Sequence, residues 1–353
     1  MLVKCKSLTV RTLILLILLF SYACTAVGAE DLYLGKRWGF SLLTKTPVHY
    51  IVWSADGKYM FFAIAGDDMS YIYRLKDVWK IIKGKTLPGD IRPERIIDVK
   101  GRIQDFSASP DRMSATYSIS EGGEHAGLYV ANLAACQTKR IADGKGARWS
   151  PDGTKILFYF MGKKGNLGIA TIKPDGTGLR ILSELGDWGP EWSPDGNNIA
   201  FLSSRGFSTG TTGYSNIYIR RLNPAGITQV THDKNSLQKN LEWAPKGKKL
   251  VFESYNGVEI IDVTTMKRKR IISRSDYFTS HRFLPFFSPD GRWIFYRKEK
   301  GMGLYEIYTQ EEINLEGSII WESITLSPDG KKVAFSVFGG SKKGLWVVEA
   351  MPY

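Results

Sequence analysis

The sequence is poor in the residues that usually build redox centres and disulfides. Its 353 residues include three cysteines, Cys5, Cys24 and Cys136. It contains no Cys-x-x-Cys-His motif, so we expect that this chain attaches no c-type haem of its own. Removal of an N-terminal leader would leave only Cys136, which excludes an intramolecular disulfide and makes packing the source of stability.

Histidine is equally scarce, and its spacing does not indicate a metal site. The four histidines are His49, His125, His232 and His281. A catalytic metal needs three converging ligands, and no such set follows from these positions, so we predict no cofactor in this chain. Asp67 and Asp68 form a Gly-Asp-Asp turn, which could bind calcium but is more simply an ordinary polar turn.

The N-terminus lacks an apolar run long enough to cross a membrane, yet it has the parts of a secretory signal peptide. Lys4, Lys6 and Arg11 form a positive segment, Leu13–Phe20 is an apolar stretch of eight residues, and Val27–Ala29 is a small-residue cleavage site. A short membrane anchor and a lipoprotein are the weaker interpretations. We therefore expect residues 1–29 to be a signal peptide and residues 30–353 to be one exported domain without a membrane span.

What the sequence does contain is a repeated tetrapeptide. Ser-Pro-Asp-Gly or a close variant occurs seven times, 39 to 55 residues apart. The copies begin at Ser54, Ser109, Ser150, Ser193, Ala244, Ser288 and Ser327. This period is the size of one four-stranded propeller blade, and a repeat of this length determines the architecture.

The chemistry of the tetrapeptide predicts a tight turn between two antiparallel strands. Proline fits the second position of a type I turn, serine and aspartate hydrogen-bond nearby backbone, and glycine accepts a positive φ at the fourth position. We assign the repeated aspartates to the turns and give them no chemical role. The strand after each turn is a nearly continuous apolar run, such as Ile156–Phe160, which is typical of strands covered on both faces.

These patterns predict an all-β fold, a seven-bladed β-propeller with four-stranded antiparallel blades. The last repeat ends after its third strand, whereas Gly39–Lys45 has the pattern of an outer strand without a blade. We expect this N-terminal strand to complete the seventh blade and close the ring, because closure protects the sheet edges.

Two short motifs have simpler interpretations than the functions they suggest. Gly206–Gly210 matches Gly-x-Ser-x-Gly, but a nucleophile elbow needs a strand-turn-helix context that a propeller loop does not offer. Lys267–Arg270 is a run of four basic residues in a chain of net charge +13. An exposed outer strand explains this run better than nucleic acid does, since an exported protein rarely meets nucleic acid.

One position departs from the repeat pattern. Glu253 is the only acid in its column of the aligned second strands, and the turn before it has changed to Ala-Pro-Lys-Gly. A carboxylate among apolar residues is costly unless it is paired or reaches a polar space. Either an ion pair, with Arg297 or a lysine, or exposure at the strand end would explain it. The functional alternative is that Glu253, Ser254, Tyr255, Asn256 and Gly257 contact the active region of a partner.

The pattern Trp-Ser-Pro-Asp-Gly-x-x-Ile-x-Phe, found as Trp149–Phe158 and Trp192–Phe201, resembles the TolB-type propeller repeat. As an exported, haem-free propeller of this length with a deviant fifth repeat, the whole chain also resembles the β subunits of hydrazine synthase from anammox bacteria. That resemblance implies haem-bearing α and γ partner subunits, which make hydrazine from nitric oxide and ammonium at c-type haems in the anammoxosome.

The expected function is therefore that of a non-haem scaffold subunit in a multihaem oxidoreductase complex. The alternative is a stand-alone, TolB-like propeller that binds other exported proteins in the periplasm. A propeller enzyme with its own site in the central channel is the third and weakest interpretation. The first predicts co-purification with haem chains, the second a separable monomer, and the third activity in the isolated chain.

Overall fold

The computed structural model is all-β and describes most of the chain after residue 39. The described residues are 40–44, 46, 48–76, 78, 92–119, 124–162, 165–207, 214–234, 239–273, 283–288, 290–298, 301–315, 321–327, 332–337 and 344–349. The expected signal peptide, residues 1–29, lies outside them. No helix among the described residues is long and apolar enough to cross a membrane.

The described strands form antiparallel sheets of four, in which strands that follow one another in sequence are neighbours. Six of these sheets are continuous in sequence. Sheet 1 contains β2 (Tyr50–Trp53), β3 (Tyr59–Ala65), β4 (Met69–Lys76) and β5 (Glu94–Lys100). Sheet 2 contains β6 (Ile103–Ala108), β7 (Ser114–Ile119), β8 (Gly127–Asn132) and β9 (Gln137–Ala142). Sheet 3 contains β10 (Lys145–Trp149), β11 (Ile156–Met161), β12 (Leu167–Ile172) and β13 (Arg180–Ser183).

The remaining sheets repeat this arrangement. Sheet 4 contains β14 (Asp187–Trp192), β15 (Asn198–Ser203), β16 (Asn216–Leu222) and β17 (Ala225–Gln229). Sheet 5 contains β18 (Lys239–Trp243), β19 (Lys249–Ser254), β20 (Gly257–Asp262) and β21 (Arg268–Ser273). Sheet 6 contains β22 (Phe286–Phe287), β23 (Trp293–Lys298), β24 (Gly301–Glu306) and β25 (Glu312–Leu315). Sheet 7 joins β26 (Trp321–Leu326), β27 (Lys332–Val337) and β28 (Gly344–Glu349) to β1 (Phe40–Thr44).

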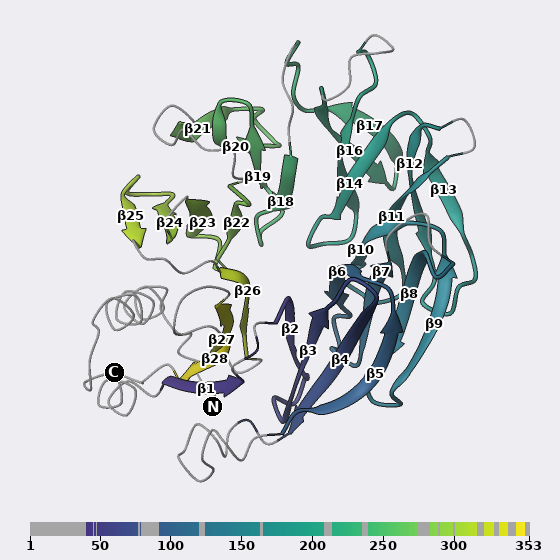
Figure 1. Cartoon of the computed structure of the whole chain (residues 1–353). Coiled ribbons are helices and arrows are strands. Elements are labelled where there is room, and N and C mark those ends of the chain that lie inside the picture. Colours follow the sequence, from purple (N-terminus) through teal and green to yellow (C-terminus); the bar gives the residue numbers. More distant parts are fainter. Residues whose placement is uncertain are drawn as a thin grey trace, which may run out of the picture.

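The sheets are arranged around a common centre, as the cartoon shows (Figure 1). The first strand of each sheet lies nearest this centre, and the fourth strand lies outside. The N-terminal segment that was expected to be an outer strand is β1, which pairs antiparallel with β28. This pairing joins two segments from opposite ends of the described chain in one sheet.

The turns confirm the chemistry predicted for the tetrapeptide. In the turn at Ser150, the Gly153 N–H donates to the Ser150 carbonyl at 2.8 Å, and the glycine has a φ of 71°. The Ser150 hydroxyl donates to Asp152 Oδ1 at 2.6 Å and accepts the Lys155 N–H at 2.9 Å. In the deviant fifth turn the corresponding backbone bond, from Gly247 to Ala244, remains at 2.8 Å. Backbone geometry therefore maintains this turn where both polar side chains are missing.

Apolar side chains fill the space between neighbouring sheets. Between sheets 4 and 5, for example, Ala200, Leu202 and Ile217 pack against Trp243 and Phe252. Similar clusters join sheets 7 and 1, 1 and 2, 2 and 3, 3 and 4, and 5 and 6. Burial of each large apolar side chain contributes about 1.5–3 kcal/mol, so the stack of sheets is the main source of stability.

Tryptophans at the ends of the first strands connect consecutive sheets by hydrogen bonds. The indole N–H of Trp149 donates to the Ser107 carbonyl at 3.1 Å, and that of Trp192 donates to the Arg148 carbonyl at 3.3 Å. Trp243 donates to the Glu191 carbonyl at 3.3 Å. Each bond joins the first strand of one sheet to the first strand of the preceding sheet and so limits how far the two strands can slide past each other.

We predict that Trp243→Phe lowers the free energy of unfolding by about 1 kcal/mol more than Trp53→Phe does. Both changes shrink a buried indole, but Trp53 Nε1 has no hydrogen-bond partner among the described residues, so only the Trp243 variant loses an intersheet bond. Chemical denaturation of the two variants and the parent measures the difference. Equal losses would mean that the indole bonds do not contribute to stability.

Candidate functional site

Three consecutive first strands share a five-residue motif that ends in tryptophan. The motif, here called the channel motif, occurs as Lys145–Trp149, Trp188–Trp192 and Lys239–Trp243. In each copy the pairing register shifts between the first and fourth residues. The second residue has a positive φ, 65° at Gly146, 57° at Gly189 and 49° at Asn240. Such β-bulges redirect the side chains that follow them.

The fourth residues of the channel motif are Arg148, Glu191 and Glu242, and they form one charged cluster. Arg148 Nε donates to Glu191 Oε1 at 2.7 Å, and Arg148 Nη1 donates to the Ala147 carbonyl at 3.0 Å. Glu242 accepts the backbone N–H of Phe287 at 3.3 Å. The cluster therefore extends across sheets 3, 4 and 5 and contacts sheet 6.

The charges in this cluster affect one another. Burial, reinforced by the negative charge of Glu191, raises the pKa of Glu242 to about 8. The Glu191 carboxylate in turn raises the pKa of Arg148. Burial also raises the pKa of Glu191, although the charge of Arg148 opposes this shift. At neutral pH the Glu242 carboxyl therefore retains its proton beside the Arg148–Glu191 pair.

A cavity of about 870 Å³ lies where the first strands of sheets 1 to 5 begin. Its wall includes Arg148 and Glu191, together with the first residues of the channel motifs, Lys145, Trp188 and Lys239. The cations that line it are Arg102, Lys145, Arg148 and Lys239, and the carboxylates are Asp105 and Glu191. A cavity of this size, with polar groups converging from several strands, is the usual form of a ligand site.

Asp105 on β6 holds the first channel motif in place. Its Oδ2 atom accepts hydrogen bonds from the Ser118 hydroxyl and from the Gly146 N–H, the latter at 2.9 Å. A Cβ added at Gly146 would lie 2.3 Å from the Tyr159 ring, in a backbone conformation that side chains rarely adopt. Gly146 is therefore required by both φ and space, and Asp105 fixes its amide.

The residues predicted from the sequence lie at the end of the β19–β20 hairpin. Glu253 is 4% exposed, and its Oε2 atom accepts hydrogen bonds from Asn240 Nδ2 at 2.8 Å and from the Phe283 N–H at 3.3 Å. Tyr255 and Asn256 form the two-residue turn, since Ser254 pairs with Gly257. Tyr255 is 68% exposed, whereas Ser254 is buried.

This placement gives Glu253 a structural function within its own chain. Its hydrogen bonds link β18 and β19 to the segment that leads into sheet 6, so the buried carboxylate has the partners that its burial requires. The predicted contact of residues 253–257 with a partner remains a prediction, and the exposed Tyr255 is the member of the group best placed to make it.

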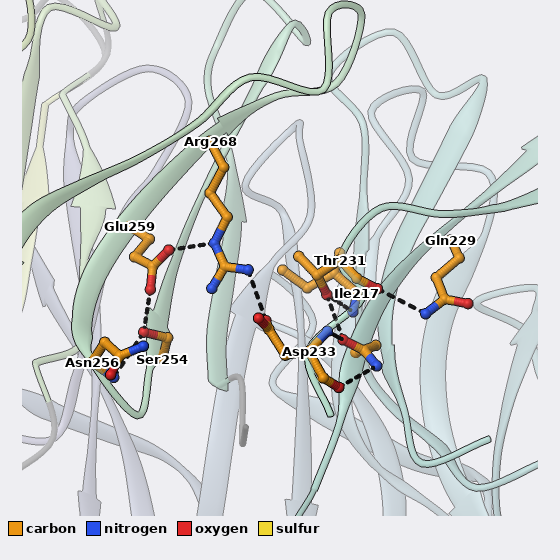
Figure 2. A network of polar contacts seen from close by, with 9 residues as sticks. Ile217, Gln229, Thr231, Asp233, Ser254, Asn256, Glu259 and Arg268 are labelled. Carbon is orange, nitrogen blue, oxygen red and sulfur yellow. Dashed lines mark hydrogen bonds and ion pairs between the residues drawn. The ribbon is translucent and has the colours of Figure 1, made fainter. Parts of the chain in front are cut away.

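Ser254 begins a polar network that connects sheets 5 and 4 (Figure 2). Its hydroxyl donates to Glu259 at 2.5 Å, Glu259 pairs with Arg268, and Arg268 Nη1 donates to Asp233 Oδ2 at 2.7 Å. The Arg268 guanidinium also lies 5.3 Å from the centre of the Phe252 ring. One arginine thus pairs with two carboxylates, Glu259 on β20 and Asp233 in the segment between β17 and β18.

The basic run Lys267–Arg270 is exposed, as expected for an outer strand, except at Arg268. Lys267, Lys269 and Arg270 are exposed, as expected. Arg268 is half-buried in the network, and Lys269 Nζ donates to Gln310 Oε1, in the turn between β24 and β25 of sheet 6, at 2.6 Å. Alternation along β21 directs these two side chains to opposite neighbouring sheets, which sequence reasoning had not distinguished.

The other sequence motifs do not converge on one site. Ser208–Gly210 of the Gly-x-Ser-x-Gly match and His281 lie outside the described residues. Asp67 Oδ1 accepts a hydrogen bond from Arg102 Nη1 at 2.6 Å, and His49 Nδ1 accepts one from the Ala65 N–H at 3.1 Å. Within the described part of the chain, no group of three or more His, Cys, Asp or Glu side chains is arranged to hold a metal ion.

The channel motif is the feature that the sequence reasoning missed. Its signal was available, because the residue before each first-strand tryptophan is charged in three successive repeats, as Arg148, Glu191 and Glu242. The comparison of the second strands singles out Glu253 and does not include these first-strand residues. Only the bulges, visible in the structure, explain why the first-strand charges gather on one side.

Four-stranded antiparallel sheets around a common centre, with a polar cavity lined by the first strands, define a β-propeller. A sequence model described as the TolB beta propeller domain matches residues 91–319. The chain belongs to this family.

Curated relatives support the family at the sequence level. The Tol-Pal system protein TolB of Francisella tularensis subsp. holarctica is 26% identical over 232 residues, which are 63% of this chain and 49% of the relative. The uncharacterized protein Atu1656 of Agrobacterium fabrum is 29% identical over 219 residues, 58% of this chain and 64% of the relative. The chain thus spans about half the length of the TolB proteins that it matches.

Solved structures share the fold at low sequence identity. Hydrazine synthase of Kuenenia stuttgartiensis has a TM-score of 0.61 and 14% identity, covering 87% of this chain and 96% of the matched chain. Oligogalacturonate lyase of Vibrio parahaemolyticus has a TM-score of 0.60 and 11% identity, covering 88% and 93%. These likenesses establish the fold and nothing finer.

Proposed function

We propose that this chain is an exported, protein-binding propeller that serves other chains as a non-haem partner. The observation that carries the proposal is the β19–β20 hairpin. A two-residue turn holds Tyr255 with 68% of its surface exposed, while the buried residues on both sides fix the turn. A rigid, exposed aromatic side chain is the usual form of an interface anchor.

The proposal includes a closed ring of seven blades formed by residues 30–353, after removal of residues 1–29. Seven four-stranded sheets among the described residues support the blade number, and the pairing of β1 with β28 supports closure by the N-terminal strand. A closed ring leaves no sheet edge for other chains to pair with. Partners would then bind at the ends of the sheets, where the hairpins and the cavity lie.

In its first specific form, the chain is a scaffold subunit of a hydrazine synthase-like complex. Its fold matches a hydrazine synthase chain over 96% of that chain's length, which supports this form at the level of architecture. The α and γ subunits would carry the c-type haems and form hydrazine from nitric oxide and ammonium in the anammoxosome. This chain would hold the haem subunits in register and do no redox chemistry.

In its second form, the chain is a TolB-like propeller that binds other exported proteins in the periplasm. The 26% identity to Tol-Pal system proteins favours this form, because it is a likeness in sequence and not only in fold. The two forms share the binding role and differ in the partner.

Gentle isolation of the protein from its native source, followed by a haem-stained gel and mass spectrometry, separates the two forms. Two c-type haem polypeptides in constant ratio with this chain would support the hydrazine synthase-like form. Haem-free exported partners would support the TolB-like form. A chain that elutes alone under all gentle conditions would contradict the proposal as a whole.

We predict that Tyr255→Ala weakens partner binding at least ten-fold, because truncation of a central aromatic anchor commonly costs about 2 kcal/mol or more. Stability should change little, since the side chain is exposed. Binding of the purified partner by isothermal titration calorimetry measures the effect. Tyr308→Ala is the matched control, because Tyr308 is 70% exposed in the turn between β24 and β25, which lies at the opposite end of the sheets. Equal binding by both variants would exclude the hairpin as the anchor.

A further inference from the structure

The cavity lined by the first strands, here called the axial cavity, presents polar groups whose hydrogen-bonding capacity the described residues do not fully use. Arg148 donates two hydrogen bonds to described residues, one to Glu191 and one to the Ala147 carbonyl, whereas a guanidinium has five N–H groups. Its side chain is 42% exposed and that of Glu191 is 22% exposed, and both line the cavity. A ligand in the cavity can therefore reach a donor and an acceptor that lie side by side.

The first residues of two channel motifs add a cation, Lys239, and an aromatic side chain, Trp188, to the wall of the cavity. The side chain of Lys239 forms no ion pair or hydrogen bond with a described residue, and neither does the indole of Trp188. Both are half-buried, and both are the first residues of channel motifs. A half-buried ammonium without a described counter-ion favours a ligand with a carboxylate, and an aromatic face favours one with an apolar ring surface.

The charge balance of the wall agrees with an acidic ligand. Four cations and two carboxylates line the cavity, and the nearby Glu242 carries its proton at neutral pH. Glu191 accepts a hydrogen bond from Arg148 and can accept further ones from the hydroxyl groups of a ligand, which a carboxylate alone does not have. A molecule that combines a carboxylate, hydroxyl groups and a ring satisfies Lys239, Glu191 and Trp188 at once.

We propose that the axial cavity is a binding site for a free uronic acid, a sugar acid that combines a carboxylate, hydroxyl groups and a ring. The carboxylate binds Lys239 and the free N–H groups of Arg148, the hydroxyls donate to Glu191, and the ring packs on Trp188. The site does not depend on which protein partner the propeller binds, because the partner hairpin and the cavity use different residues.

Titration calorimetry of the full exported chain with glucuronate tests this site, with glucose as the matched ligand that lacks the carboxylate. We expect one saturable glucuronate site and at least ten-fold weaker binding of glucose. Lys239→Gln should weaken glucuronate at least ten-fold, because a hydrogen bond to a charged group contributes about 1.5–3 kcal/mol. Trp188→Leu should weaken both ligands. Lys246→Gln, an exposed lysine in the turn at the other end of β18, should leave both affinities unchanged.

Three results would overturn the proposal. The first is the absence of saturable glucuronate binding by a folded parent chain, and the second is glucuronate binding that Lys239→Gln leaves unchanged. The third is Lys239-dependent binding of a hexaglutamate peptide without binding of glucuronate, which would assign the cavity to acidic peptides. Co-isolation of partner proteins is a separate readout, so failure of the sugar site leaves the protein-binding proposal standing.

Discussion

Arg268→Ala should lower the free energy of unfolding by about 3–5 kcal/mol, the largest effect that we expect from a single polar substitution. The reason is that Glu259, whose side chain is 5% exposed, would lose its cation and remain a buried charge. Asp233 would lose the same partner, although it is 29% exposed and can be hydrated. Urea denaturation followed by circular dichroism measures the change.

Three further variants identify the cause of this loss. Lys267→Ala, one residue earlier on the same outer strand segment, is exposed and should change stability by less than about 0.5 kcal/mol. Arg268→Lys keeps the charge and should recover part of the loss. Arg268→Met combined with Glu259→Gln removes both charges and should be more stable than Arg268→Ala. A loss below about 1 kcal/mol in Arg268→Ala would contradict the importance of the network.

Glu242→Gln should make stability much less dependent on pH between about 4.5 and 8. Burial and the charge of Glu191 raise the pKa of Glu242 from its ordinary value of 4.5 to about 8 in the folded protein. Between these two pH values the folded state binds more protons than the unfolded state. The contribution of Glu242 to the free energy of unfolding is therefore complete below pH 4.5 and is lost as the pH rises through 8. At about 1.4 kcal/mol per pKa unit, a rise of this size corresponds to a loss on the order of 5 kcal/mol at alkaline pH.

The variant and the parent should therefore have similar stability near pH 5, and the variant should be the more stable near pH 9. Glutamine retains an oxygen that can accept the Phe287 N–H, so the contact with sheet 6 survives the change. Unfolding curves at a series of pH values measure both proteins. Parallel pH profiles of the parent and the variant would show that Glu242 does not carry the buried proton.

The turn aspartates affect stability in a lower pH range than Glu242 does. The hydrogen bond from Ser150 lowers the pKa of Asp152, and similar bonds act at Asp56 and Asp195.

Much of the fold could be predicted because the turn chemistry is local. Ser-Pro-Asp-Gly specifies a turn from four adjacent residues, and the apolar run after it is a second strand wherever the pattern occurs. The outer strand of sheet 6, β25 at Glu312–Leu315, was not predicted. Its sequence, Glu-Ile-Asn-Leu, is short and polar at alternate positions, so only pairing with β24 identifies it as a strand.

The site was less predictable because it depends on bulges and on contacts across sheets. Glu253 was recognised from its column, but its partner Phe283 is 30 residues away and its partner Asn240 lies on another strand. The orientation of Arg148, Glu191 and Glu242 follows from a positive φ two residues earlier in each strand. The glycines at two of these positions, Gly146 and Gly189, indicate an unusual backbone conformation. The asparagine at the third, Asn240, is equally common in ordinary polar turns. The shifts in strand pairing at these bulges, and not the residue types alone, bring Arg148, Glu191 and Glu242 together.

The measurement that tests the central claim most directly is the mass of the native particle. The protein, isolated gently from its native source, would be analysed by native mass spectrometry alongside the recombinant chain. Our account predicts a native particle heavier than one chain, with partner chains in fixed stoichiometry, and a recombinant Tyr255→Ala chain that fails to rebind those partners. A native particle with the mass of the single chain, at every ionic strength tried, would contradict the account.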